Sequence, residues 1–235
     1  LRDIISFLNI FRYITFRSAM AALTAFIISL IFGPVLIRKL KKNKIGEQVR
    51  IEDSQKLHEL HRSKQDTPTM GGILILAAII LSTLLWADIF NKYILIVLFS
   101  TIWLGITGFV DDYTKQIKKK SKGLTATAKL TSQIILGLIL GIILLLDSQM
   151  NIKLDVPLLK DISLNLDGFY VIFGINESAG SSNAVNLTDG LDGLAIGCTI
   201  IAAITYAVFS YISGNVKITD YLNIFYLPSS GELAV

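Results

Sequence analysis

Long apolar runs separated by polar segments dominate this chain of 235 residues. A bilayer core needs about 20 predominantly apolar residues in a helix, and the first four runs are each near that length. Six runs have the character of membrane-spanning helices, and a seventh begins near Glu232. The six cover residues 18–37, 71–87, 93–110, 128–146, 168–184 and 190–212. The pattern predicts an all-α polytopic membrane protein, organised as one transmembrane domain over residues 1–235.

Three local features modify this pattern. The fifth run is the weakest, because Asn176, Glu177 and Ser178 interrupt it. Pro34 lies inside the first run and predicts a kink there, since proline removes a helical hydrogen bond. Residues 147–167 alternate loosely between apolar and polar side chains, which favours a short hairpin on the outer side of the membrane.

The basic residues predict the orientation of the chain. Lysine and arginine gather after the first and third runs and are sparse after the second, fourth and sixth. Cytoplasmic loops carry such an excess, so we expect the N-terminus outside. Cytoplasmic segments are then expected at about 38–70, 111–127 and 183–192. The same distribution accounts for the net charge of +4 and gives no reason to expect a nucleic-acid partner.

One stretch, Asn183-Ala-Val-Asn-Leu-Thr-Asp-Gly-Leu-Asp192, places four amide or acid side chains three residues apart. That step predicts a polar stripe along one side of a helix. Ionisable groups at membrane depth are costly and indicate a functional site. Asp189 and Asp192 would repel each other if buried together, unless a cation or a donor lies between them. Mg²⁺ suits that place, because it takes one or two carboxylates together with phosphate oxygens.

A second acidic group, Asp111-Asp112, ends the third run. Adjacent helical residues point about 100° apart, so we expect one carboxylate to face a site and the other to pair with a loop lysine. Acids at a helix C-terminus oppose the helix dipole, which favours a functional role over a solvated end. Lys64, just before Thr67-Pro-Thr-Met-Gly-Gly72, is either a phosphate contact or one more member of a basic loop.

Together these stretches resemble the bacterial phospho-N-acetylmuramoyl-pentapeptide transferases, within the larger polyprenyl-phosphate N-acetylhexosamine-1-phosphate transferases. The likeness covers essentially the whole chain and corresponds to the N-terminal two-thirds of that family. The sequence Val185-Asn-Leu-Thr188 favours the muramoyl branch of the family over the N-acetylglucosamine-phosphate branch. The stretches that carry it are Tyr13-Ile-Thr-Phe-Arg17, Thr67-Pro-Thr-Met-Gly-Gly72, Gly108-Phe-Val-Asp-Asp-Tyr113 with Lys115, Asn183 to Ala195, Tyr221-Leu-Asn-Ile and Gly231-Glu-Leu.

The resemblance implies a reaction and its participants. Phospho-N-acetylmuramoyl-pentapeptide passes from UDP to undecaprenyl phosphate, UMP is released, and the first lipid-linked peptidoglycan precursor forms. The resemblance further implies Mg²⁺ as cofactor and the bilayer of the bacterial cytoplasmic membrane as surroundings, with the active face towards the cytoplasm. The UDP-linked sugar peptide and undecaprenyl phosphate are the expected partners, and a homodimer is left open.

The same resemblance implies roles for individual residues. Asp111, Asp112 and Asp189 are the expected catalytic residues, with Asp111 or Asp112 accepting the proton of the lipid phosphate. The family's third acidic motif and its histidine cluster lie beyond Val235, so the main metal ligand is expected there. The chain alone is therefore expected to lack a complete metal site and activity. The expected substrate-binding residues are Lys64, Thr69, Asn183, Asn186, Asp189, Asp192, Lys115, Lys122 and Lys129.

Three other interpretations stay open. One is a related N-acetylglucosamine-1-phosphate transferase, and another is a membrane scaffold without catalysis. The third is an ion-coupled transporter with Asp111, Asp189 and Asp192 along an ion path. Transporters bind near the bilayer midplane and use inverted repeats. These acids are expected near the cytoplasmic ends of the runs and no repeat is visible, so the enzyme is favoured.

Overall fold

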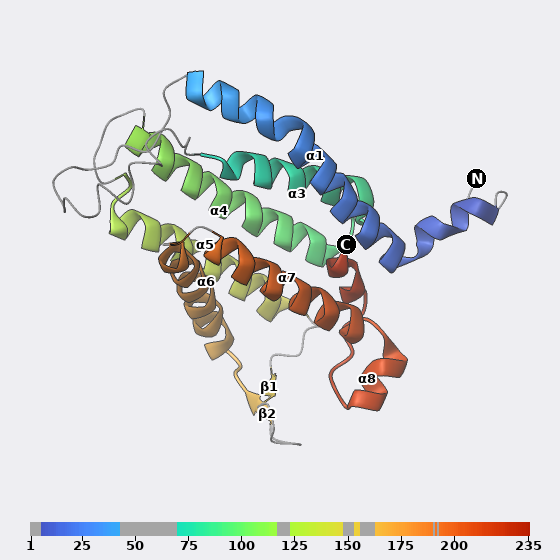
Figure 1. Cartoon of the computed structure of the whole chain (residues 1–235). Coiled ribbons are helices and arrows are strands. Elements are labelled where there is room, and N and C mark those ends of the chain that lie inside the picture. Colours follow the sequence, from blue (N-terminus) through green and yellow to red (C-terminus); the bar gives the residue numbers. More distant parts are fainter. Residues whose placement is uncertain are drawn as a thin grey trace. The chain divides into compact units, whose positions relative to one another are not determined.

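The computed structural model describes residues 6–42, 70–116, 123–147, 153–155, 163–189, 191 and 193–235. Figure 1 traces its elements along the chain. Four helices are long and apolar enough to cross a membrane, and a fifth is apolar but shorter. The four are α1 (Ile14–Lys42), α4 (Lys92–Gln116), α5 (Ala126–Leu146) and α7 (Leu194–Ser213), and the shorter one is α3 (Gly72–Trp86). The predicted all-α polytopic class is confirmed.

The remaining elements are shorter or more polar. Helix α6 (Phe169–Thr188) corresponds to the weak fifth run, and α8 (Val216–Leu222) comes after α7 in the chain. Two 3₁₀ helices, η1 (Ser6–Arg12) and η3 (Ser230–Ala234), lie near the ends of the described chain. Because η3 has five residues, the start of a seventh spanning helix near Glu232 stays a prediction.

The expected hairpin is confirmed within residues 147–167. Strand β1 (Lys153–Asp155) pairs in antiparallel register with β2 (Ser163–Asn165), and Leu154 lies opposite Leu164.

The helices extend beyond the apolar runs that predicted them. Helix α1 reaches Lys42, α4 reaches Gln116 and α6 reaches Thr188. An α-helix satisfies its own backbone hydrogen bonds, so it can continue where the side chains become polar. The expected cytoplasmic loops at 38–70, 111–127 and 183–192 therefore begin with helix, which corrects the prediction. Helix α1 also continues through Pro34, and the kink stays a prediction.

The contacts divide the chain into two compact units built from segments far apart in sequence. The first unit contains Leu1–Ala19, Ala87–Ser100 and Ala126–Val235. The second unit contains Met20–Trp86 and Thr101–Thr125. The single-domain organisation of the chain stays a prediction.

In the first unit, α5 and α6 pack with their backbones in contact. A Cβ atom added at Gly137 would lie 2.6 Å from the Cα of Ile175, and one at Gly141 would lie 2.9 Å from the Cα of Val171. Small residues four apart let two membrane helices approach in this way. Glycine is thus required at both positions by the neighbouring backbone.

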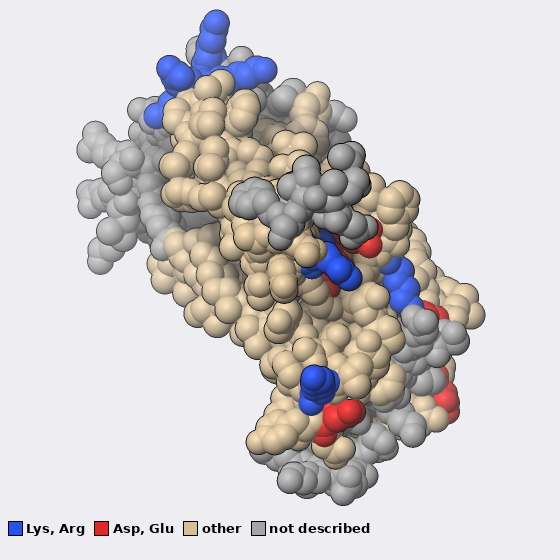
Figure 2. Space-filling model, turned by 90° about the vertical axis from the view of Figure 1, so that its right-hand side faces the viewer, with Lys and Arg blue, Asp and Glu red and all other residues tan. Residues whose placement is uncertain are grey.

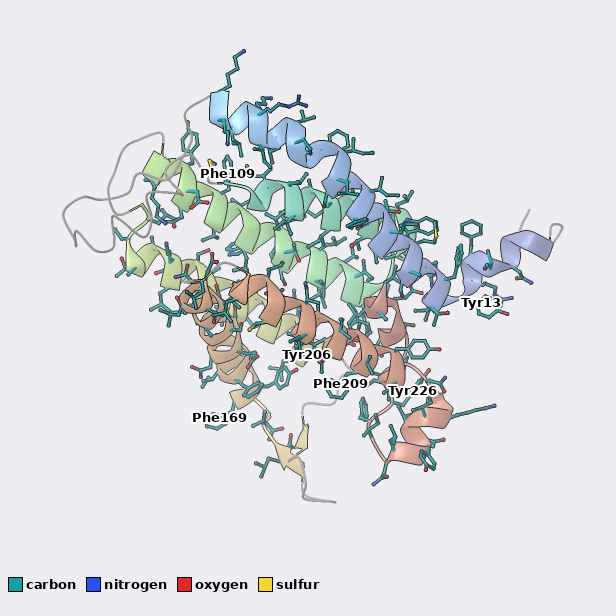
Figure 3. All side chains as sticks on the ribbon, viewed as in Figure 1. Tyr13, Phe109, Phe169, Tyr206, Phe209 and Tyr226 are labelled. Carbon is teal, nitrogen blue, oxygen red and sulfur yellow. The ribbon has the colours of Figure 1, made fainter. Side chains whose placement is uncertain are left out.

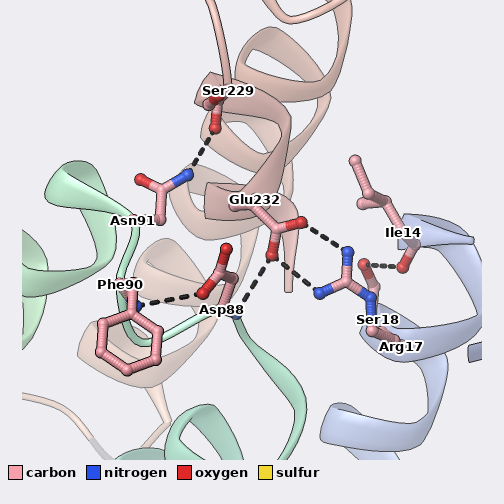
Figure 4. Close-up of polar contacts among 8 residues, drawn as sticks. All are labelled: Ile14, Arg17, Ser18, Asp88, Phe90, Asn91, Ser229 and Glu232. Carbon is pink, nitrogen blue, oxygen red and sulfur yellow. Dashed lines mark hydrogen bonds and ion pairs between the residues drawn. The ribbon is translucent and has the colours of Figure 1, made fainter. Parts of the chain in front are cut away.

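A partly buried ion pair joins the beginning of α1 to η3 in the same unit (Figure 4). Arg17 Nη1 lies 2.8 Å from Glu232 Oε2, and Arg17 Nη2 lies 2.5 Å from Oε1. Each side chain is 15% exposed. The backbone N–H of Asp88 donates to Glu232 Oε2 at 3.2 Å, and the Asn91 amide donates to the carbonyl of Ser229 at 2.9 Å. Glu232 and Ser229 therefore connect η3 both to the start of α1 and to the segment that contains Asp88 and Asn91.

The surface of both units is largely apolar. Figure 2 shows small, separate groups of charged side chains with broad uncharged surface around them. In the first unit, Tyr206 and Phe209 of α7 project outward, and Tyr13 and Phe169 are exposed at the starts of their helices (Figure 3). Exposed apolar side chains on this scale mark a surface that meets lipid or protein. With the spanning helices, they describe a multi-pass membrane protein.

We predict that Gly137→Ala destabilises the full-length protein by about 1–3 kcal/mol, because the new methyl group overlaps a backbone that cannot move away. Thermal unfolding in detergent measures the effect. Gly180→Ala in α6 is the matched control, since nothing lies within 4 Å of its Cβ position. Equal unfolding temperatures for the two variants would contradict the close contact of α5 with α6.

We predict that Glu232→Gln costs about 2 kcal/mol of stability, between the values for exposed and buried pairs, because it leaves the partly buried Arg17 cation without its carboxylate. Asp147→Asn is the control. It removes a partner of Lys92. Asp147 is 18% exposed but Lys92 is 39% exposed, so water can solvate the lysine that remains and the expected loss is about 0–1 kcal/mol. The same unfolding measurement compares them, and a smaller loss for Glu232→Gln than for Asp147→Asn would overturn this account.

Candidate functional site

The acidic pair predicted from the sequence lies in the last two turns of α4, in the second unit. Asp111 is buried, with a side chain 10% exposed. Lys115 Nζ donates to its Oδ2 at 2.6 Å, and the backbone N–H of Leu124 donates to its Oδ1 at 2.8 Å. Acid followed by lysine four residues later is the favourable order in a helix. Asp111 therefore has a donor on each carboxylate oxygen.

Asp112 has different surroundings. Its side chain is 44% exposed, and Lys115 Nζ lies 4.0 Å from its Oδ1. It lines a cavity of about 170 Å³ whose other lining residues are apolar or glycine. Those residues are Met70, Gly72, Ile73, Leu76, Gly105, Gly108 and Phe109. As the 100° step predicts, the two carboxylates have different surroundings: Asp111 is buried among donors, and Asp112 lines the cavity. The partner lysine is part of α4, however, and not of a loop, because the helix runs on to Gln116.

A second polar cluster joins α5 to α6 in the first unit. The Gln133 side chain is buried, and its Nε2 donates to Ser182 Oγ at 2.9 Å. Its Oε1 accepts from Asn183 Nδ2 at 2.8 Å, and its backbone carbonyl accepts from Ser178 Oγ at 3.3 Å. Sequence reasoning missed Gln133, although a lone glutamine in an apolar run was a signal for it. Buried amides that are fully paired fix the register of two helices.

This cluster also explains part of the polar interruption of the fifth run. Ser178 faces α5, whereas Asn176 returns its amide to the carbonyl of Ile172 at 3.1 Å. Glu177 is exposed on α6.

The predicted polar stripe is not continuous. Asn183 and Asn186 lie on α6, and Asp189 is its C-cap residue, with its N–H donating to the carbonyl of Val185 at 3.2 Å. Helix α7 starts only after Gly193, whose φ of 81° is in the region that favours glycine. The chain therefore turns between the two helices, and one helical stripe through residue 192 is wrong. Asn186 and Asp189 are exposed, while Asn183 uses its amide hydrogens on Gln133 and Ala179.

Four expected site residues fall outside the described residues: Lys64, Thr69, Lys122 and Asp192. Lys129 lies in the first turn of α5, half-buried, one turn before Gln133. The meeting of Asp111 with Asp189 stays a prediction, since they belong to different units.

The described residues contain no group of three or more histidine, cysteine, aspartate or glutamate side chains that could hold a metal ion. Magnesium does not require such a group, because it keeps water and binds through one or two carboxylates plus phosphate oxygens. The exposed carboxylates of Asp112 and Asp189 are hard oxygen donors of that kind. Their chemistry fits magnesium held together with a phosphorylated ligand.

Comparison with known proteins connects these features. The family model of glycosyl transferase family 4 matches residues 94–229, and phospho-N-acetylmuramoyl-pentapeptide-transferase signature 1 matches residues 64–76. Proteins named phospho-N-acetylmuramoyl-pentapeptide-transferase are 45% identical in Desulforapulum autotrophicum, 44% in Desulfosudis oleivorans and 46% in Desulfatibacillum aliphaticivorans. These matches cover 97% or 98% of this chain. The chain spans 62% or 63% of the length of those relatives.

The matches include residues that the structure singles out. The longer match contains Asp111 and Asp112 and the end of α6 with Asp189, and the shorter one contains Lys64 and the start of α3. The family resemblance seen in the sequence is confirmed: the chain belongs to glycosyl transferase family 4 and carries a phospho-N-acetylmuramoyl-pentapeptide-transferase signature.

Proposed function

We propose that the full-length protein transfers phospho-N-acetylmuramoyl-pentapeptide from its UDP carrier to undecaprenyl phosphate. The observation that carries the proposal is the coincidence of the family match with Asp112, a carboxylate that faces a cavity at the end of a membrane helix. The names of the relatives supply the transferred group. The UDP carrier and undecaprenyl phosphate come from the family resemblance of the sequence. The proposed setting is the bacterial cytoplasmic membrane, with the N-terminus outside and the reaction on the cytoplasmic face, as the lysine and arginine distribution favours.

Phosphoryl transfer depends on in-line positioning and charge neutralisation more than on covalent chemistry. An oxygen of the lipid phosphate would attack the sugar-side phosphorus, and the bond from that phosphorus to the oxygen leading to UMP would break. The acceptor phosphate is largely dianionic near neutral pH, since its second pKa is about 6. Only a minor fraction has a proton to lose, so Asp111 or Asp112 would accept a proton without carrying most of the barrier.

The charged and polar side chains have distinct proposed tasks. Lys115, Lys122 and Lys129 would attract the lipid and diphosphate anions. Lys64, Thr69, Asn186 and Asp192 would contact the nucleotide substrate. Asn183 would act through Gln133, by fixing the end of α6 from which Asp189 extends.

Asp189 would help to hold the magnesium ion. When bound, Mg²⁺ would neutralise the charge that collects on the phosphate oxygens. The exposed position of Asp189 at the end of α6 supports this assignment.

We predict that Asp189→Asn lowers the rate of UMP release from the UDP-linked substrate at least tenfold, which is about 1.4 kcal/mol or more. The amide keeps the shape of the side chain and removes its charge. Asp220→Asn, at another exposed aspartate of the same unit, should leave the rate unchanged. A full rate in Asp189→Asn would refute the site. Flux of substrate into sealed vesicles with no chemical conversion would instead support a transporter.

We predict that removing divalent cations with EDTA abolishes UMP release and that added Mg²⁺ restores it, because the carboxylates alone repel the diphosphate. The assay uses the UDP-linked muramoyl pentapeptide and UDP-N-acetylglucosamine side by side. Turnover that persists in EDTA would exclude the metal role. Preference for UDP-N-acetylglucosamine would move the protein to the related branch of transferases.

A further inference from the structure

Gly123 lies directly against the acidic pair. Its backbone has φ of +61°, a left-handed conformation that glycine adopts without strain. A Cβ atom at this position would lie 2.5 Å from Asp111 Oδ1 and 2.7 Å from Lys115 Cε. Real Cβ atoms do not come so close to other heavy atoms. The conformation thus favours glycine, and any Cβ atom here would displace the side chains of Asp111 and Lys115.

Because the backbone at Gly123 lies close to Asp111, the following residue can form a hydrogen bond with its carboxylate. The next residue, Leu124, donates its backbone N–H to Asp111 Oδ1, while Lys115 Nζ donates to Oδ2. A buried carboxylate needs donors on both oxygens, because desolvation is costly without them. The segment at residues 123–124 therefore completes the surroundings of Asp111.

The helix end makes this donor more important. Carboxylates in the last turns of a helix oppose its dipole, and two adjacent carboxylates repel each other. With Asp111 held by Leu124 and Lys115, Asp112 is the carboxylate of the pair that lines the cavity. A displaced Asp111 would leave Lys115 Nζ with only its longer contact, 4.0 Å, to Asp112 Oδ1 in place of the 2.6 Å contact to Asp111.

We infer that Gly123 is a positioning residue for the transfer reaction. It admits the Leu124 N–H to Asp111, and Asp111 in turn holds Lys115 beside Asp112, which lines the cavity. This inference rests on the proposed function for its effect on rate, and on geometry alone for its effect on Lys115.

The activity test uses the full-length protein and UMP release. Gly123→Ala should lower kcat at least tenfold and change KM for the UDP-linked substrate by a smaller factor, because the proposed nucleotide contacts at Lys64, Thr69, Asn186 and Asp192 are unchanged. Gly123→Asn should behave alike: asparagine tolerates positive φ, but its Cβ meets Asp111 in the same way. A normal kcat in Gly123→Asn would show that backbone strain alone matters and would overturn the inference.

A second measurement does not depend on activity. An amine held in an ion pair must leave it before it can attack an acylating reagent, so mass spectrometry of peptides can report the state of Lys115. Lys217, which is exposed on α8, is the internal reference. The labelling ratio of Lys115 to Lys217 should rise at least threefold in Gly123→Ala and in Asp111→Asn. It should stay unchanged in Gly180→Ala.

The two measurements separate the possible failures. If the wild-type protein releases no UMP but the labelling ratio rises in Gly123→Ala, the proposed function fails and the contact of Gly123 with Asp111 stands. If the wild type is active and Gly123→Ala keeps both its kcat and its labelling ratio, the positioning role is refuted.

Discussion

Hydrogen bonding without water is the constraint on which this structure depends. In a bilayer core every backbone N–H and C=O must find a partner within the protein, so the spanning segments are helices. Small hydroxyl side chains follow the same rule, because most of those in the helices donate to the carbonyl four residues earlier. Thr24 bonds to Met20, Ser100 to Ile96 and Ser210 to Tyr206 in this way. Apolar surface can then face outward along almost the full length of each helix.

A few polar side chains bond outside their own helix, and these show which segments are fixed to one another. Gln133 bonds across to α6, and Asp111 bonds to a segment beyond the end of α4. Each joins two parts of the chain that apolar packing alone would leave free to slide. The cluster at Gln133 sets the end of α6, and the cluster at Asp111 sets the end of α4. The carboxylates assigned to chemistry, Asp189 and Asp112, lie one or a few residues from these fixed points.

The sequence predicted the helices well and the site in part. Apolar run lengths located the spanning helices, because the bilayer thickness imposes them. The helix ends were less predictable: α4 continues to Gln116 through the pair of Asp111 with Lys115, which an apolar run cannot reveal. The polar stripe at 183–192 was predicted as one helix, yet the turn before Gly193 divides it. Gln133 and Gly123 depend on contacts between segments distant in sequence, and periodicity contains no information on those.

The ion pair between Arg17 and Glu232 also constrains how the protein is made. Its partners are 215 positions apart, so the ribosome adds Glu232 long after α1 has left the exit tunnel. At about 5–20 residues per second, the delay is roughly 10–40 s. During biogenesis the first helix must therefore remain inserted with an arginine that still lacks its carboxylate. Glu232 then secures the start of the first helix, so this part of the first unit is completed only after the later segments have been made.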